Sequence, residues 1–295
     1  MGNAMIGLIG GTGLGEALTR GSKGELKEVD TPFGRPSGPI LMAEIEGQRV
    51  AILARHGKGH RFNPSQVPYR ANIFALKQLG VTHILASGAV GSLRDSIAPR
   101  HLVVCDQVID RTTRPGKTFF DDLVVHVGFA DPFCPSLRGL LVECGMGMAT
   151  TVHTRGTYVC MEGPQFSTRA ESLLHREWGA DLIGMTCMPE AKLAREAEIC
   201  YALIAIPTDY DCWRPHEPGA SPDAVMESII ANVEAGTAGA IALMKAAVPR
   251  IAETVGPECG CRSALAQAIW TDPGSIDPKV LERLGPLVGK YVKPA

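Results

Sequence analysis

The sequence predicts an α/β fold, in which a single domain holds a mixed β-sheet flanked by helices. Short apolar runs alternate with longer helical patterns, and each apolar run ends in Gly, Pro or a polar residue. No internal repeat or composition-biased linker divides the chain. With 295 residues, 45% of them hydrophobic and 20% charged, the chain is long enough to bury a sizeable core.

The apolar runs have the length of buried strands. Strands that are covered on both faces read as continuous apolar runs, so we expect helices on both sides of the sheet. The predicted strands are Met5–Ile9, Arg49–Ala54, Ile84–Ser87, Leu102–Cys105, Tyr158–Met161, Leu182–Met185 and Tyr201–Ile206.

Helical patterns lie between these strands. Thr168 and Glu171 have the spacing of a capping box, and Ser221 is a candidate N-cap for the longest helix. The predicted helices are Ala71–Leu79, Leu137–Cys144, Arg169–Trp178, Pro189–Ala197 and Pro222–Ala247. We expect residues 1–250 to form the main domain, and 251–295 a helical tail that packs on this domain or on a neighbouring subunit.

Composition and charge exclude several classes of partner. The formal net charge is -2, too small for a field that would hold nucleic acid or an anionic membrane. No apolar run reaches the roughly 20 residues of a membrane span, and no basic flank marks a signal peptide, so we expect a cytoplasmic protein. There are 9 cysteines but no CxxC pair, so we expect buried thiols and no structural zinc site.

Glycine-rich or cationic clusters follow several predicted strands. Gly10-Gly11-Thr12-Gly13 suits either an anion site or a plain tight turn, and Glu16 occupies the third glycine position of a dinucleotide fingerprint. Arg55-His56-Gly57 offers a planar fork for a tetrahedral anion, although an isolated Arg-His pair is more often a surface loop. Further clusters are Ser87-Gly88-Ala89-Val90-Gly91-Ser92 and Met185-Thr186.

Paired acids follow the last predicted strand. Asp209 and Asp211 alternate, so on an extended backbone they would share a side. Such a pair beside aromatic residues indicates acid–base work or recognition of donor groups, and the alternative is a solvated turn. Because open α/β sheets bind ligands at the carboxyl ends of their strands, the clusters together predict an anion cradle with two carboxylates. That set suits a reaction in which phosphate becomes bonded to one part of a substrate while the other part leaves as a base.

The same residues resemble the 5′-methylthioadenosine phosphorylases, in the trimeric branch of the purine nucleoside phosphorylases. The resemblance spans residues 6–250. It implies a purine nucleoside phosphorylase-like mixed sheet, a homotrimer or dimer of trimers, and phosphorolysis of 5′-methylthioadenosine in purine and methionine salvage. It implies no metal or organic cofactor, with inorganic phosphate as a substrate. The matching motifs are Ile9–Gly13, Val29–Gly34, Ala54–Gly57, Pro132–Pro135, Glu162–Ser167, Met185-Thr186 and Thr208–Trp213.

The resemblance assigns roles position by position. At Gly88 the human-type pattern has Thr, so one hydroxyl contact is lost and backbone or Ser87 would compensate. Asp211 would be the acid or hydrogen-bond partner at purine N7, and Asp209 would accept from the 6-amino group. The phosphate would meet Thr12, Arg55, His56, Gly88, Ala89 and Thr186, and the nucleoside would meet Phe166, Ser167, Met185, Val225, Met226 and His126 of a neighbouring subunit.

Alternatives remain at this point. A 6-oxopurine nucleoside phosphorylase, for inosine, guanosine or methylthioinosine, tends to carry Asn in place of one acid, whereas this chain has both Asp209 and Asp211. A nucleosidase would have no use for the phosphate set, and a non-catalytic nucleoside-binding protein would not need all of it. Cys259-Gly260-Cys261 resembles a CxC seen in disulfide-bearing members from hot environments, and Cys134 and Cys200 could also pair, with reduced thiols as the alternative.

Overall fold

The structure is a computed structural model that describes residues 5–11, 14, 17–18, 23–215 and 221–292. It confirms the predicted α/β architecture. Among these residues the strands form a mixed sheet in the order β2-β3-β4-β1-β5-β10-β9-β7. Off this path, β11 pairs with β5 and β6, and β8 pairs with β6. The strands are β1 (Met5–Gly10), β2 (Gly24–Lys27), β3 (Ile40–Ile45), β4 (Gln48–Ala54), β5 (Val81–Ser92), β6 (Leu102–Val104), β7 (Gln107–Asp110), β8 (Val152–His153), β9 (Thr157–Cys160), β10 (Leu182–Gly184) and β11 (Cys200–Asp209).

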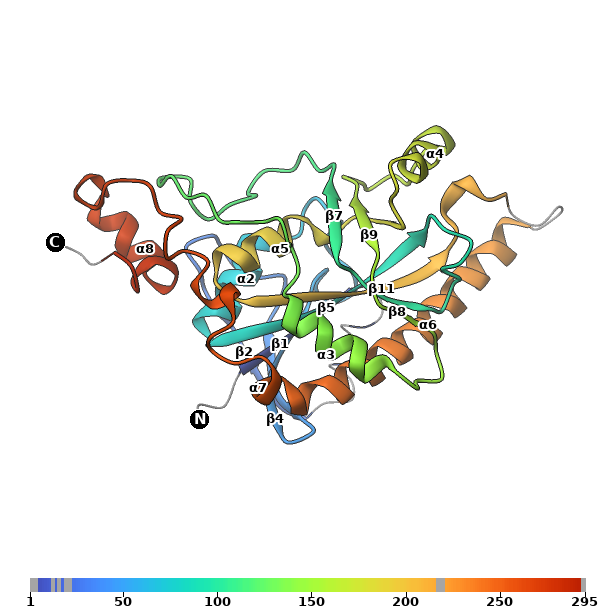
Figure 1. Cartoon of the computed structure of the whole chain (residues 1–295), viewed down its shortest axis with the longest axis horizontal. Helices are drawn as coiled ribbons and strands as arrows, with labels where there is room; N and C mark the ends of the chain where they lie inside the picture. The colour runs from blue at the N-terminus through green and yellow to red at the C-terminus, as the bar shows by residue number, and fades with distance from the viewer. Residues whose placement is uncertain (1–4, 12–13, 15–16, 19–22, 216–220, 293–295) are drawn as a thin grey trace.

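Helices cover both faces of the sheet (Figure 1). The largest core cluster holds residues of α2 (Tyr69–Gln78) and α5 (Cys187–Glu196), and a second holds residues of α3 (Pro135–Gly145), α6 (Pro222–Ala247) and α7 (Ile251–Thr254). The capping box predicted for α4 (Arg169–Glu177) is present, as is the Ser221 cap of α6. Although α6 is long and apolar enough to span a membrane, it packs Gly236 and Leu243 in the core next to β11.

The central strand β5 is longer than predicted. It runs in parallel beside β1 and β11, and its last residues pair with β10. The glycine-rich segment from Ser87 to Ser92 therefore lies inside the strand, and the prediction that it follows the strand is wrong. Pairing with neighbours on both sides outweighs the low strand propensity of glycine.

The tail beyond residue 250 packs along the body of its own chain. Leu265, Leu284 and Val288 belong to the same core cluster as α2 and α5. Glu198 holds the tail at two points, since its Oε1 accepts from the Leu265 N–H at 3.0 Å and from the Tyr291 hydroxyl at 2.6 Å. The tail comprises α7, the short helices Gly260–Ser263 and Pro273–Ser275, and α8 (Pro278–Val288).

Candidate active site

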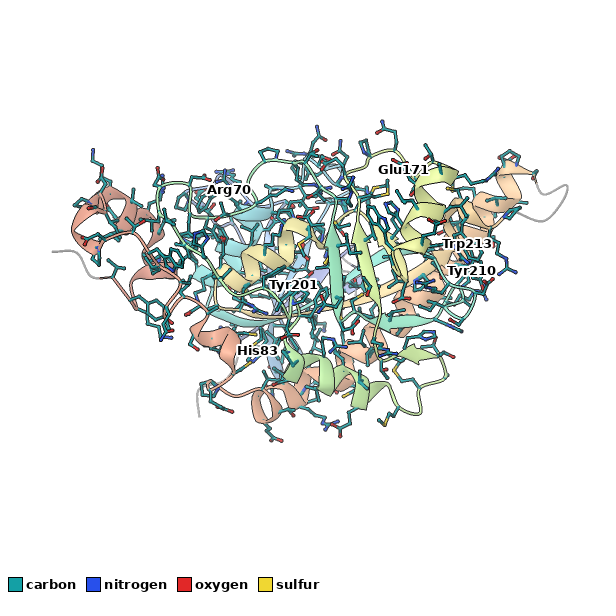
Figure 2. All side chains as sticks on the ribbon, turned by 45° about the horizontal axis from the view of Figure 1, so that its top comes forward. Arg70, His83, Glu171, Tyr201, Tyr210 and Trp213 are labelled. Carbon is teal, nitrogen blue, oxygen red and sulfur yellow. The ribbon has the colours of Figure 1, made fainter. Side chains whose placement is uncertain are left out.

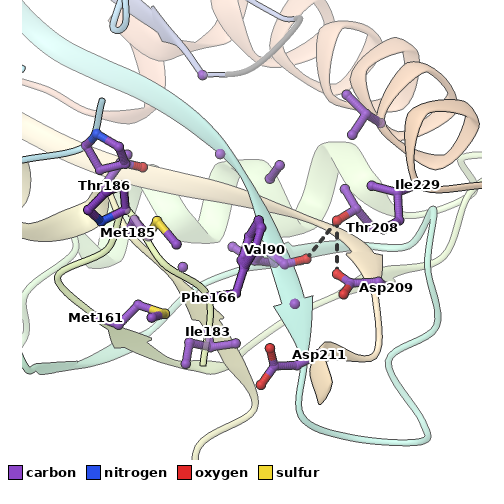
Figure 3. Close-up of a pocket in the computed structure, with 18 of the residues that line it drawn as sticks. Val90, Met161, Phe166, Ile183, Met185, Thr186, Thr208, Asp209, Asp211 and Ile229 are labelled. Atoms are coloured by element: carbon purple, nitrogen blue, oxygen red, sulfur yellow. Dashed lines mark hydrogen bonds between the residues drawn. The ribbon is translucent and has the colours of Figure 1, made fainter. Parts of the chain in front are cut away.

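The carboxyl ends of β1, β4, β5, β9, β10 and β11 surround one cavity of about 350 Å³. Several loops and the helix α6 complete its wall (Figure 3). In this view Thr186 and the two aspartates lie at opposite ends, with Val90 and Phe166 between them. The lining residues are Gly11, Arg55, His56, His60, Pro64, Gly88–Gly91, Met161, Pro164, Phe166, Ile183–Thr186, Thr208, Asp209, Asp211, Ile229 and Val233.

Arg55 reaches this cavity from the end of β4, and it is fully buried. Its Nε and Nη2 each donate to a carboxylate oxygen of Glu190 at 2.7 Å, and Nη1 donates to the Ser87 carbonyl at 2.8 Å. Burial disfavours the cation, but the Glu190 carboxylate outweighs this effect and raises the pKa of Arg55. These bonds use three of the five guanidinium N–H groups, so the side chain is rigid and two N–H groups remain for a ligand.

Glu190 lies in the first turn of α5, and Tyr201 also donates to its Oε1 at 2.8 Å. The sequence pattern placed Glu190 only at a helix start and missed this pairing. Arg55 and Glu190 are 135 positions apart, so no local spacing could reveal that they pair. Glu190 is the one charged residue between Leu182 and Ala191, and an acid in such an uncharged stretch is the signal that could have suggested a buried cationic partner.

His56 is a neutral side chain at the same end of the cavity. Burial and the adjacent Arg55 cation lower the pKa of His56 to about 4. Its Nδ1 lies 2.8 Å from the Phe62 carbonyl, so Nδ1 carries the proton and Nε2 is left as an acceptor. The His60 ring stacks on His56 at a centroid distance of 4.2 Å.

Glycines let the backbone approach closely at this end. A Cβ on Gly11 would lie 3.0 Å from both Arg55 Nη1 and the Ser87 carbonyl oxygen. Among the described residues, a Cβ on Gly88 would meet only Thr186 Oγ1, at 3.4 Å. The buried hydroxyl of Ser87 has no hydrogen-bond partner among the described residues. The predicted phosphate ligand Thr12 lies outside the described residues.

Asp209 and Asp211 both line the opposite end of the cavity. The expectation of an extended backbone through this pair is wrong, because Asp209 ends β11 and Asp211 begins a 3-10 turn with a φ of 49°. Thr208 Oγ1 donates to Asp209 at 3.1 Å, and the Ser172 hydroxyl of α4 donates to Asp211. The turn brings the two carboxylates to one cavity by a route that strand alternation does not describe.

Trp213 closes the turn that carries Asp211. Its Nε1 donates to the Ser92 carbonyl at the end of β5 at 2.8 Å, and the Arg176 guanidinium lies 3.4 Å from its ring centroid. Figure 2 shows Trp213 and Tyr210 together at one end of the molecule. The turn is thus attached to both β5 and α4, which fixes the position of Asp211.

Comparisons with known proteins identify the family of the chain. The family model described as "Phosphorylase superfamily" matches residues 5–248. The chain belongs to the phosphorylase superfamily. An S-methyl-5′-thioadenosine phosphorylase of Geobacter sulfurreducens is 48% identical over 98% of this chain and 99% of that protein. The corresponding protein of Gloeobacter violaceus is 46% identical over 98% of this chain and 96% of its own length.

Solved structures show the same phosphorylase fold. A methylthioadenosine phosphorylase from an Antarctic soil metagenomic library superposes with a TM-score of 0.86 at 44% identity, covering 97% of this chain and 99% of that one. An S12T mutant of the Schistosoma mansoni adenosine/methylthioadenosine phosphorylase, in complex with methylthioadenosine, superposes with a TM-score of 0.81. It is 33% identical and covers 90% of this chain and 99% of its own.

The remaining predicted residues of this phosphorylase fall into two groups. Phe166, Met185, Ala89 and Thr186 line the cavity. Four others lie outside its lining. Ser167 Oγ lies 3.7 Å from Met161 Sδ, and Val225 lines an adjoining hollow that shares Asp209 and Asp211. Met226 is 56% exposed, and the His126 ring packs on Trp270 at a centroid distance of 4.8 Å.

Helix α6 presents Ile229 and Val233 to the cavity of this phosphorylase. The sequence analysis missed both residues. They lie one and two helical turns beyond Val225, on the same side of the helix, so the helix was identified and its rotation was not. Only the packing of α6 against β11 determines which of its apolar residues face the cavity.

Proposed function

We propose that this chain cleaves 5′-methylthioadenosine with inorganic phosphate, giving adenine and 5-methylthioribose 1-phosphate. One observation carries the proposal: a single cavity holds a rigid arginine and a neutral histidine at one end and two carboxylates at the other. The relatives and the superfamily membership support it. As a pentosyl transfer, the reaction belongs to purine and methionine salvage, which we place in the cytoplasm.

Phosphate would bind between Arg55, His56 and Thr186, with the backbone of Gly88 and Ala89 and the hydroxyl of Thr12 completing the set. The two unused N–H groups of Arg55 would donate to phosphate oxygens, and neutral His56 Nε2 would accept from a protonated one. The anion then lies beneath the sugar, where its charge stabilises the positive charge that develops on the ribose. No metal or organic cofactor takes part in this scheme.

In the transfer, a phosphate oxygen forms a bond to the anomeric carbon while the bond from that carbon to purine N9 breaks. The bonding electron pair goes to the purine, whose departure is easier when N7 is protonated or hydrogen-bonded. Asp211, which accepts from the Ser172 hydroxyl, would in its acid form give a proton or a hydrogen bond to N7 and so neutralise the charge that the purine takes on leaving. Asp209 would accept from the 6-amino group. Phe166 would cover the base, with Ser167 beside it, and Met185 would lie against the ribose.

The 5′-methylthio group requires an apolar wall. Ile229 and Val233 of α6 supply one within the cavity, and Val225 extends it into the adjoining hollow. In a homotrimer or dimer of trimers, His126 from a neighbouring subunit would complete this wall of the cavity, and Met226 would lie near the wall. Trp270 is 69% exposed beside His126, which suits a surface that another subunit covers.

Initial rates with methylthioadenosine, adenosine, inosine and methylthioinosine test the substrate, each with and without phosphate. We expect the highest kcat/KM with methylthioadenosine and no turnover without phosphate. A preference for a 6-oxopurine would contradict the role of Asp209, and phosphate-independent cleavage would identify a nucleosidase. Mixing His126→Ala subunits with Asp211→Ala subunits should restore part of the activity if His126 acts in the neighbouring site.

A further inference from the structure

Four cysteines from distant parts of the chain converge on one point. Cys134 precedes α3, Cys200 begins β11, and Cys259 and Cys261 lie in the tail around its first short helix. Their four sulfur atoms all lie within 4.8 Å of one another, and the Cys134 and Cys259 sulfurs are 3.6 Å apart. No part of the catalytic proposal uses these residues.

The spacing suits a tetrahedral metal site. With zinc–sulfur bonds of about 2.3 Å, the sulfur atoms at the corners of a tetrahedron are about 3.8 Å apart. The upper limit of 4.8 Å on the sulfur separations exceeds this value by about 1 Å, and the 3.6 Å between Cys134 and Cys259 is close to it. A disulfide instead requires about 2.05 Å between two sulfurs, so its formation would break the four-fold arrangement into pairs.

The surroundings also suit a buried cation. Cys134, Cys200 and Cys261 are buried, whereas Cys259 is partly exposed and borders a surface hollow that also contains Cys261. That hollow gives an ion a path to the cluster. Four thiolates around a divalent ion leave a net charge of -2. Arg195 in the same hollow and the positive N-terminal end of α3 would offset part of it, whereas Asp131 and Glu258 in that hollow would add to it.

We propose that Cys134, Cys200, Cys259 and Cys261 form a structural site for a thiophilic divalent cation, with zinc as the expected ion. All four positions are occupied by protein ligands, so no open position is left for a substrate or water. Binding releases the thiol protons and is not a redox step. The sequence predicted no structural zinc site because it contains no CxxC pair, whereas the proposed site takes its ligands from three separate segments.

The position of the site defines its role. β11 carries Cys200 at its first residue and Asp209 at its last, which places the two about 30 Å apart along the strand. The metal is therefore remote from the catalytic cavity. It would attach the tail, which leaves α7 and continues to α8, to the beginning of β11 and of α3.

Metal content tests the proposal directly. Protein prepared under reducing conditions with zinc in the growth medium should contain about one zinc per chain by elemental analysis. Cobalt(II) exchanged into the site should give the visible ligand-field bands and thiolate-to-cobalt charge-transfer absorption of a tetrahedral sulfur site. Cys259→Ser, at the partly exposed ligand, should lose most of the zinc and the cobalt spectrum. Cys144→Ser, outside the cluster, is the matched control and should retain both.

The outcomes separate the alternatives. Wild-type protein that contains no zinc and gives no cobalt spectrum would overturn the proposal. So would disulfides among these four residues in freshly prepared protein, detected by non-reducing peptide mass spectrometry. If Cys259→Ser is insoluble, Cys261→Ser and the cobalt spectrum of the wild-type protein still decide. Because the readout is metal content and not turnover, a failure here leaves the proposed phosphorolysis unaffected.

Discussion

The side chain of Arg55 reaches the cavity with its charge already paired. Glu190 takes two of its N–H groups and Ser87 a third, so the orientation of the guanidinium is set before any anion arrives. The sequence predicted that Arg55 lies at an anion site, since Arg and His follow an apolar strand. It could not predict Glu190, because the pairing of two buried charges depends on how β4 and α5 pack.

Glu190→Gln tests this positioning. The change leaves a buried cation uncompensated, which we expect to cost roughly 3–5 kcal/mol of stability. It should also raise the KM for phosphate more than that for the nucleoside, because the guanidinium becomes free to turn. Urea unfolding and steady-state kinetics measure the two effects, with Glu177→Gln in α4 as the control. An unchanged KM for phosphate would show that Glu190 does not position Arg55.

Asp211 and Ser172 give a second prediction at this scale. Asp211→Ala removes the proposed partner of N7 and should lower kcat by roughly a hundredfold to ten-thousandfold. Ser172→Ala leaves the carboxylate in place but loses the hydrogen bond that holds it, so the loss should be smaller. Stopped assays with methylthioadenosine measure both. If Asp211→Ala retained full turnover with a native circular dichroism spectrum, the assignment of the acid would be wrong.

At the scale of elements, the prediction from sequence succeeds where the signal is local. The bounds of α6 and the capping box of α4 follow from caps and periodicity, and the structure confirms both. The strands β2, β7 and β8 were not predicted, because they are short, mostly not buried, and form only by pairing with other segments. The strand β3 was also missed, although it contributes Ile40 and Leu41 to the core and pairs with the next strand, β4. The same holds for the candidate site. Its local motifs were predicted from the sequence, whereas the face of α6 that lines the cavity was not.

The glycines of β5 provide the prediction for an element. A Cβ on Gly91 would lie 3.0 Å from Asp211 Cβ and 3.1 Å from Ile183 Cγ2, so Gly91→Ala should displace the acid and lower kcat. In the part of the chain that the structure describes, a Cβ on Gly88 meets only Thr186 Oγ1, so Gly88→Ala should fold normally and act mainly on the KM for phosphate. Kinetics of the matched pair checks this. Equal kcat in the two variants would mean that the fit of Asp211 against β5 is unimportant.

At the scale of the whole molecule, the tail and the sheet are joined through buried polar groups. His83 lies near the beginning of β5, opposite Ile6 of β1 and Cys200 of β11, and away from Trp213 and Tyr210 (Figure 2). Its Nε2 donates to the Val255 carbonyl of the tail at 3.0 Å. Nδ1 lies 2.8 Å from Thr82 Oγ1, which leaves the ring neutral. Burial lowers the pKa of His83 to about 4 from 6.5.

This burial predicts how stability depends on pH. Between about pH 6.5 and 4 the unfolded chain binds a proton at His83 that the folded chain does not, so acidification favours unfolding. The contribution of neutral His83 to the free energy of unfolding, fully present above pH 6.5, should fall by up to ~3 kcal/mol at pH 4. Burial raises the pKa of Glu196 to about 7, which makes stability change with pH in the opposite sense. Comparing the wild type with His83→Gln therefore isolates the effect of His83. Urea midpoints across this range should fall less in the variant, and equal slopes would exclude His83 as a source.

Trp213 gives the site a built-in optical reporter. Its indole shares one short turn with Asp211 and is anchored to the end of β5, while Arg176 lies over its ring. A purine that enters the cavity changes the field and the solvation around that turn, and indole emission responds to both. Adenine titrated into the protein should therefore shift or quench the intrinsic fluorescence, Trp213→Phe should abolish the signal, and binding can be followed without any label.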